Sequence, residues 1–209
     1  MKKPQTVARL TDLGRVQLSP NFFMRDFLYS EVAAIYGLSN IPDDPDLAIA
    51  AGTRLCEELL EPLQEAFGRI AIRSAYRSAE VNALGNAKGH NCASNERNFA
   101  GHIWDRRDAA GQMGATACIV VPSFASRFTG PEDWKRLAWW VHDHLPYSAM
   151  EFFPVRWAFN LQWHERPLRM IYSHIPEQRG YLTRPGMPGH DDDHGAEWEA
   201  ILPERTGRP

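Results

Sequence analysis

His90, Cys92 and Asp105 are side chains with metal-binding chemistry, and they lie in one stretch of the chain, residues 89–105. A cysteine thiolate, a neutral imidazole and a carboxylate all suit zinc. A zinc ion with three protein ligands keeps one position for water, lowers the pKa of that water and polarises a carbonyl group. This stretch therefore predicts an unconventional zinc site that could support hydrolysis.

A fourth candidate ligand, His164, lies at the end of a predicted strand over residues 157–164. Side chains two apart on a strand share a face, so Asn160 and His164 would border the same site. Hydrolysis also needs a carboxylate that moves a proton, and the nearby acids are Glu151 and Glu165. We do not expect His102 in the ligand set, because on a predicted strand over 101–105 it would face away from Asp105.

The elements that must position these groups follow from hydrophobic spacing. The clearest helix is predicted over residues 46–67, where leucines and a phenylalanine recur every four residues and Pro62 should kink or split it. Further helices are expected near 19–28, 30–37, 78–84 and 131–144, and strands at 69–74, 101–105, 115–121, 157–164 and 169–173. Residues 85–100 read as a long loop, of the kind that often carries function.

This order of elements predicts an α+β fold in which N-terminal helices pack on an antiparallel sheet. We expect three parts: an irregular arm over 1–17, a main domain over 18–182, and an extended tail over 183–209 that is rich in proline and glycine and docked by Trp198.

Composition excludes several classes of protein. The chain has 209 residues, a hydrophobic content of 44% and a formal charge of −3, which argue for a folded core and against a dedicated nucleic-acid binder. No run of residues is apolar enough for a membrane span, and no signal peptide is expected after Met1. The three widely spaced cysteines do not form a disulfide framework.

The segment from Ile70 to Asn82, IAIRSAYRSAEVN, resembles the I-x-S-G-Y-R-S-x-x-V-N segment of zinc D-Ala-D-Ala carboxypeptidases and related peptidoglycan endopeptidases. This superfamily includes VanX and the hedgehog signalling domain. The resemblance covers roughly residues 18–175 and implies a hedgehog/D,D-peptidase-like fold. It also implies that Arg77, with Ser74 and Tyr76 beside it, binds the terminal carboxylate of a peptidoglycan stem peptide, since a guanidinium suits a planar carboxylate.

Family members bind zinc through an S-x-H-x-x-G-x-A-x-D-I segment and a later W-x-H strand. Residues 101–105 match the G-x-A-x-D part, which implies that Asp105 is a ligand, but an ungapped count places Asn98 and Asn160 at the two histidine positions. A gapped alignment places Cys92 there instead, with His90 two residues earlier, and His164 resembles the W-H ending of the VanX branch.

Two hypotheses remain open. The first is an active zinc metallopeptidase with an altered site drawn from His90, Cys92, Asp105 and His164. The second is a catalytically inactive member of the same fold that binds cell wall or forms part of a phage-like particle, beside other virion or tail proteins. Without a signal peptide, we expect synthesis in the cytoplasm and release by lysis or within such a particle.

Overall fold

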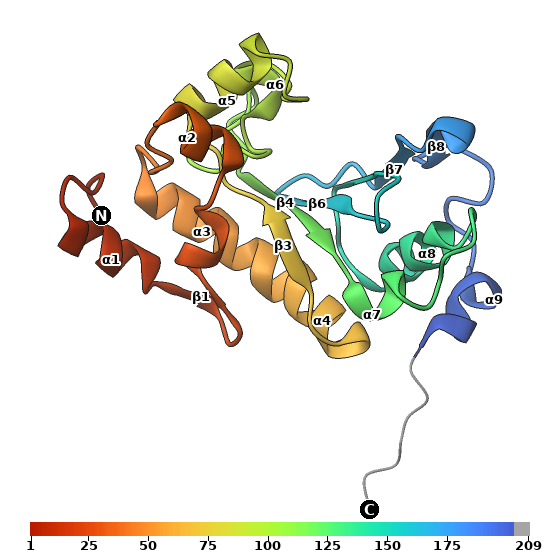
Figure 1. Ribbon diagram of the computed structural model, residues 1–209. Coiled ribbons are helices and arrows are strands. Elements are labelled where there is room, and N and C mark those ends of the chain that lie inside the picture. The colour runs from red at the N-terminus through yellow and green to blue at the C-terminus, as the bar shows by residue number, and fades with distance from the viewer. Residues whose placement is uncertain (203–209) are drawn as a thin grey trace, which may run out of the picture.

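An open six-stranded sheet positions the candidate site in the computed structural model of the protein (Figure 1). The structure describes residues 1–202, and residues 203–209, the end of the predicted tail, lie outside the described residues. The strands are β1 (Gln17–Ser19), β2 (Phe22–Phe23), β3 (Ala71–Ser74), β4 (Gly114–Val120), β5 (Ala149–Phe152), β6 (Phe159–His164), β7 (Met170–Ser173) and β8 (Gly180–Thr183).

The large sheet has the strand order β3-β4-β6-β5-β7-β8, and β1 and β2 form a separate hairpin. Its neighbouring strands are antiparallel except β5 and β7, which are parallel. The predicted α+β class with a mainly antiparallel sheet is therefore confirmed.

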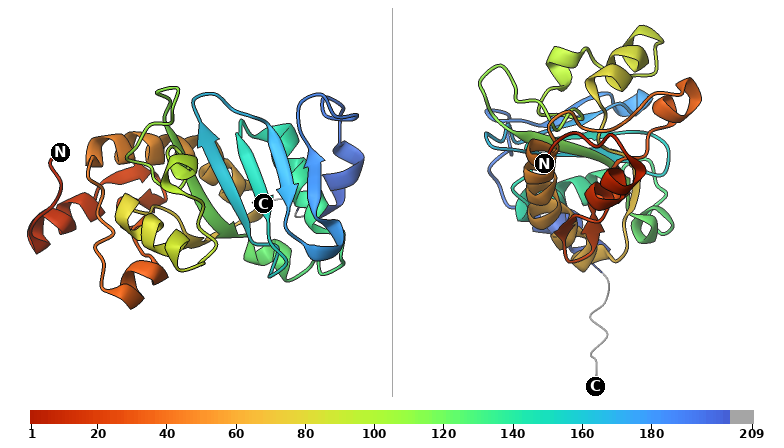
Figure 2. Two further views of the ribbon diagram at one scale, coloured as in Figure 1. Left: turned by 90° about the horizontal axis from the view of Figure 1, so that it is seen from above. Right: turned by 90° about the vertical axis from the view of Figure 1, so that its left-hand side faces the viewer.

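Helices cover one face of this sheet and leave part of the other face open. The helices are α1 (Val7–Gly14), α2 (Glu31–Tyr36), α3 (Pro45–Leu55), α4 (Glu61–Phe67), α5 (Ala79–Ala87), α6 (Asn95–Asn98), α7 (Pro122–Ala125), α8 (Trp134–His144) and α9 (Gly195–Trp198). Seen from above, the strands face the viewer while α3 and α8 lie behind them (Figure 2).

The alternation of residues along β6 shows which face of the sheet the helices cover and which face is open. Phe159, Leu161 and Trp163 alternate with polar residues along the strand and are buried in the core on the helical side. Asn160 and His164 therefore lie on the open face, as the alternation of a strand requires. The sequence prediction that these two side chains share a face is consistent with this register.

The helix predicted over 46–67 forms as α3 and α4, joined by a wider π-helical turn at Cys56–Leu60. Pro62 follows this turn, has no backbone N–H and cannot donate to the carbonyl four residues earlier. A π turn is one way for a helix to continue past such a position. The prediction that Pro62 divides the helix agrees with this geometry.

The N-terminal predictions were partly wrong. The arm is not irregular, because α1 forms with Thr6 as its N-cap, where the threonine oxygen accepts from the Arg9 N–H. The helix expected near 19–28 is replaced by the β1–β2 hairpin and a short 3-10 turn at Met24–Phe27. The buried Phe22 and Phe27 pack against each other there, with ring centroids 5.9 Å apart.

The strand expected over 101–105 was also wrong. Its backbone turns back on itself, since the N–H groups of Gly101 and Ile103 both donate to the carbonyl of Asn98 rather than to a neighbouring strand. Ile103 and Trp104 are fully buried and anchor this turn in the core.

The C-terminal segment up to residue 202 packs on α8. Trp198 donates to the Asp143 carboxylate over 2.6 Å and its ring lies edge-on to His144. The expected docking of the tail by Trp198 is therefore confirmed for the described residues. Its expected extended conformation was wrong in part, because α9 and a 3-10 turn at Glu199–Ile201 form within it. Among residues 1–202, the structure contains no helix with the length and apolar character of a membrane span.

Candidate functional site

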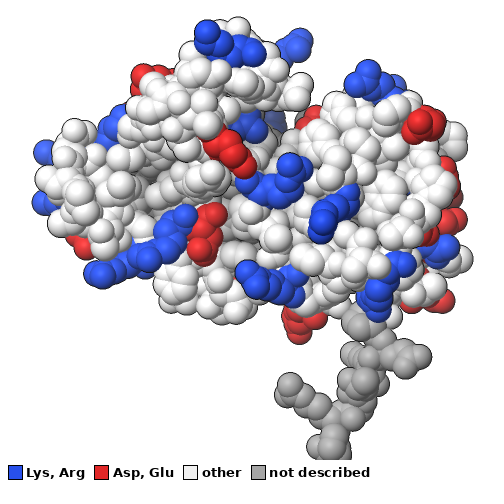
Figure 3. Space-filling view, in the orientation of Figure 1, with Lys and Arg blue, Asp and Glu red and all other residues white. Residues whose placement is uncertain are grey.

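A polar cleft lies on the open face of the sheet, beneath the loop that joins α5 to β4. It consists of two adjoining cavities, each of about 570 Å³. Figure 3 shows a notch at the upper edge of the molecule, between the lobe of α5 and α6 and the lobe of β7 and β8. The residues that line both cavities are Ala93, Asn98, His102, Glu151 and Asn160.

A row of cross-strand neighbours on the open face of the sheet leads to the cleft, which Asn160 and Glu151 line. Ser74 on β3 pairs with Cys118 on β4, Cys118 pairs with Asn160 on β6, and Asn160 pairs with Glu151 on β5. Directly opposed residues of neighbouring strands point to the same face, so the sheet register itself brings these side chains into line. Burial raises the pKa of the Cys118 thiol, which therefore stays protonated at neutral pH.

The wall of the cleft is a tight turn built around Asn98. The Asn98 side chain accepts from the His102 backbone N–H over 3.0 Å and donates to Asn82 over 2.6 Å. The turn lies close against β4, where a Cβ atom on Gly114 would come within 2.1 Å of the Ala100 carbonyl oxygen. Glycine at position 114 is therefore what allows the turn to reach the sheet.

His102 points into the cleft as a neutral imidazole. Its Nδ1 lies 2.7 Å from the carbonyl oxygen of Ala75, which can only accept, so Nδ1 carries the proton and Nε2 keeps its lone pair. Burial, and then the nearby Arg77 charge, lower the pKa of His102 to about 3. His102 thus offers an acceptor at neutral pH, because protonation would place a positive charge in a buried position and next to the charge of Arg77.

Arg77 lies where the cleft meets a second, more apolar pocket of about 330 Å³ beside α2. Its guanidinium contacts the side-chain oxygen of Asn82 at 3.3 Å and the sulfur of Cys92 at 3.2 Å. Within residues 1–202 no carboxylate lies within 4.0 Å of this guanidinium. The charge of Arg77 is therefore not paired with a carboxylate of the described residues.

Glu151 is the one carboxylate among the described residues that line both cavities of the cleft. It accepts from the Asn160 amide over 2.8 Å and lies 3.9 Å from the imidazole of His174. Its predicted role in moving a proton stays a prediction. Glu165 does not line the cleft, since its carboxylate accepts from the Met113 N–H over 2.7 Å beyond the end of β6.

The predicted zinc ligands are not brought together. His90 is exposed and its ring lies 3.0 Å from the Tyr36 hydroxyl, while Cys92 contacts Arg77. His164 lines the far end of the cleft, where Nε2 lies 3.3 Å from the carboxylate of Asp108.

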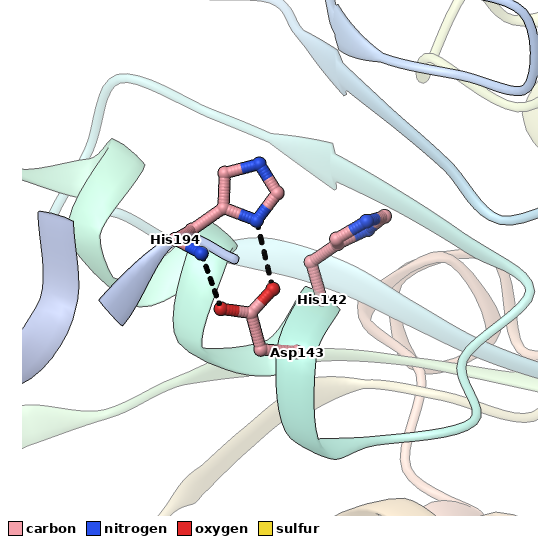
Figure 4. Close-up of side chains that lie close together, drawn as sticks. All are labelled: His142, Asp143 and His194. Atoms are coloured by element: carbon pink, nitrogen blue, oxygen red, sulfur yellow. Dashed lines mark hydrogen bonds and ion pairs between the residues drawn. The ribbon is translucent and has the colours of Figure 1, made fainter. Parts of the chain in front are cut away.

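Asp105 lies outside the cleft and has a structural role. It is 3% exposed and accepts from the backbone N–H groups of Asp43 and Asp44, just before α3. Burial raises the pKa of Asp105. Within residues 1–202, one group of three metal-ligating side chains has its ligand atoms within 4.8 Å of one another (Figure 4), and none of the predicted zinc ligands belongs to it. The predicted donors therefore do not fit a three-ligand zinc site.

The predicted substrate-binding residues divide into two groups. Arg77, Asn98 and Asn160 line the cleft, and Ser74 lines the apolar pocket next to it. The placement of Tyr76 was wrong, because its side chain is fully buried against Trp104 and cannot meet a ligand.

Three further cleft residues were not expected from the sequence. His102 was set aside because residues 101–105 resembled a strand, and a turn instead rotates it toward Asn160. His174 and Arg179 follow β7 and reach the cleft through the sheet topology. No local pattern around them signals this position.

Comparison of the chain with protein-family models, with curated proteins and with solved structures finds no match.

Proposed function

We propose that the cleft binds a peptide that ends in a free carboxylate, that Arg77 holds this carboxylate, and that the ligand is a peptidoglycan stem peptide. The observation that carries the proposal is the Arg77 guanidinium, which lines the cleft, contacts the Asn82 side-chain oxygen and the Cys92 sulfur, and has no carboxylate partner among residues 1–202. A guanidinium binds a planar carboxylate through two parallel hydrogen bonds, and more strongly where water is partly excluded.

The charge at the Arg77 end of the cleft supports an anionic ligand. Arg77 and Arg179 both line this cavity, whereas Glu151 is its one acidic lining residue in the described part of the chain. His102 is neutral there at physiological pH and adds no charge. The remaining lining offers amides, from Asn98 and Asn160, that can both donate to and accept from a peptide backbone.

The contact between two distant segments supports a D,D-peptidase-like fold. The Arg77 backbone N–H donates to the His102 carbonyl over 2.8 Å, and the His102 ring donates to Ala75. The two segments that carry the family resemblance, residues 70–82 and 101–105, thus meet at the mouth of the cleft. We propose on this ground that the chain shares the ancestry of the peptidoglycan hydrolases.

In this proposal the protein binds the stem peptide and does not cleave it by the zinc mechanism of that family. The reason is that the predicted zinc ligands do not lie together. Asp105 accepts a hydrogen bond from the backbone just before α3, and His164 lies next to the carboxylate of Asp108. A cell-wall-binding role follows.

Calorimetry with a stem peptide that ends in D-Ala-D-Ala tests the proposal. Wild-type protein should bind the peptide, and Arg77→Gln should weaken binding by about 10- to 150-fold, because a charge-assisted hydrogen bond is worth about 1.5–3 kcal/mol. Arg73→Gln is the matched control, since Arg73 is an exposed arginine of β3 that lines neither cavity.

Chromatography of the peptide after incubation completes this test. The peptide should remain intact with and without added zinc. Cleavage by wild-type protein would instead support the metallopeptidase hypothesis, and equal affinity of wild type and Arg77→Gln would show that the guanidinium does not hold the carboxylate.

A further inference from the structure

The apolar pocket beside α2 adjoins the polar cleft at Arg77. Its volume is about 330 Å³, and Arg77 and Cys92 line both this pocket and the neighbouring cavity of the cleft. Arg77 therefore lies between two spaces of different character, one polar and one mainly apolar. A ligand held at Arg77 can reach into both.

Helix α2 supplies the apolar wall of this pocket. Val32, Ile35 and Tyr36 line it, and their spacing of three and four residues places them on one face of the helix. Ser30 and Gly37 set the bounds of this helix, since the Ser30 side chain caps the first turn and Gly37 has a left-handed φ of 66°. Ile35 is 79% exposed and Tyr36 is 40% exposed, so this face has apolar area that a ligand can bury.

Contacts within the chain hold the groups around the pocket in place. The Tyr36 hydroxyl lies 3.0 Å from Nε2 of His90 and the two rings are 5.7 Å apart, which joins the end of α2 to the loop after α5. Cys92 packs on α5 at Gly85, where a Cβ atom would lie 2.6 Å from the sulfur. The same sulfur contacts the Arg77 guanidinium at 3.2 Å, so the residues of this loop also position the arginine.

The position of Arg77 determines which part of a peptide meets the pocket. A peptide whose terminal carboxylate lies at Arg77 continues in one direction only. The cleft offers the amides of Asn98 and Asn160, which suit a peptide backbone, whereas backbone groups without partners are costly against an apolar wall. The backbone therefore fits the cleft, and the side chain of the last residue, which lies next to the carboxylate, fits the pocket.

The volume of the pocket exceeds what the side chain of alanine can fill. Ligand pockets in proteins usually have volumes of about 300–1,000 Å³. The pocket beside α2 falls within this range, and a single methyl group would leave most of it to water. Because apolar burial favours binding in proportion to the area buried, a larger apolar side chain should bind there more tightly.

The charges at the pocket favour an uncharged side chain. Glu31 and Arg77 both line it. The carboxylate of Glu31 would repel an acidic side chain, and the guanidinium of Arg77 would repel a basic one. A branched or aromatic apolar side chain meets neither penalty.

We propose that the apolar pocket selects the last residue of the bound peptide and prefers a large apolar side chain there over the methyl group of alanine. This inference rests on the proposed function, because it takes Arg77 as the residue that holds the terminal carboxylate. Val32, Ile35 and Tyr36 are then the residues that determine specificity for the end of the peptide.

Calorimetry with three stem peptides that differ only in the last residue tests this inference. The peptides end in D-Ala, D-Leu or D-Asn, and all are free acids. The D-Leu peptide should bind wild-type protein at least tenfold more tightly than the D-Ala peptide, since each buried CH₂ group favours binding roughly fourfold. The D-Asn side chain is similar in shape to that of leucine but polar, so the D-Asn peptide should bind no more tightly than the D-Ala peptide.

Variants of α2 locate the effect in the pocket. Val32→Trp should occupy the pocket and remove the advantage of the D-Leu peptide, while the D-Ala peptide still binds. Ala34→Trp is the matched control and should keep the advantage, because Ala34 is an exposed residue of the same helix that lines a different cavity. Ile35→Ser, at an exposed position, should reduce the advantage by roughly fourfold, the effect of about one buried CH₂ group.

Equal affinity of wild type for the D-Leu and D-Ala peptides would overturn this inference and leave the role of Arg77 intact. A full D-Leu advantage in Val32→Trp would overturn it as well. If circular dichroism shows that Val32→Trp does not fold, Ile35→Ser decides in its place, and an unchanged advantage there counts against the inference. Failure of wild type to bind any of the three free acids would instead overturn the proposed function, and this inference with it.

Discussion

His102 carries the most direct prediction at the scale of single residues. It is buried beside Arg77, and its pKa lies at about 3, below the usual value of 6.5. We expect the His102 ring resonances to show no titration between pH 8 and pH 5 in an NMR experiment. A midpoint near 6.5 would mean that the ring is solvated, and that the turn at residues 98–103 does not close on the sheet.

The sign of the resulting pH effect on stability follows from linkage. Between pH 6.5 and about 3 the unfolded chain protonates this histidine and the folded chain does not, so the free energy of unfolding falls as pH falls. His102→Gln should therefore lose less stability than wild type between pH 7 and pH 5 in urea denaturation.

The residue types in the sequence predicted only some of the residues that line the cleft. Arg77 was predicted as a carboxylate ligand, and the structure places its unpaired charge in the cleft. Asp105 was predicted as a metal ligand because the spacing of residues 101–105 matches the G-x-A-x-D part of the family segment that the chain resembles. The spacing of residues in the sequence cannot show that the backbone N–H groups of Asp43 and Asp44 donate to this carboxylate, because the contact joins residues far apart in the chain.

At the scale of elements, the turn over 98–103 and strand β4 determine the shape of the cleft. Gly114→Ala should displace the turn, because the new Cβ would lie 2.1 Å from the Ala100 carbonyl oxygen. We expect a loss of about 1–3 kcal/mol of unfolding free energy, the usual range for overpacking. Stem-peptide affinity should fall with it.

Urea denaturation and calorimetry of the Gly114→Ala variant check this. A variant with wild-type stability and affinity would show that the turn adapts without cost and does not shape the cleft.

Strong periodicity predicted some elements well. The strand expected over 115–121 forms as β4, and the apolar spacing of residues 46–67 yields α3 and α4. The apolar run at 101–105 was misleading, because Ile103 and Trp104 are buried as anchors of a turn. Short apolar segments do not distinguish a strand from a buried turn without knowledge of the hydrogen-bond partners.

At the scale of the whole molecule, three carboxylates tie the chain ends or the N-terminal hairpin to the body. Lys3, followed by Arg106, lowers the pKa of Asp43. The pKa of Glu61 and that of Asp143 are also low, because hydrogen bonds from Asn21 and Trp198 respectively outweigh the opposing effect of burial.

Acid should therefore weaken the contacts that hold the N-terminal and C-terminal segments against the rest of the protein. Each lowered pKa contributes stability that is present above the unfolded value, near 4, and is lost as pH falls through the folded value. Asp105 acts in the opposite direction, since its pKa is raised. Limited proteolysis at pH 7 and pH 4 should show earlier cleavage of both ends at pH 4, and identical patterns would contradict this account.

The measurement that tests the central claim most directly is the affinity of wild-type protein for one stem peptide in two forms, the free acid and its C-terminal amide. The two ligands differ only in the group that Arg77 is proposed to hold. The account predicts that the free acid binds at least tenfold more tightly than the amide in calorimetry, and that this difference disappears in Arg77→Gln. Equal affinity of wild type for the two forms, or no binding of either, would contradict it.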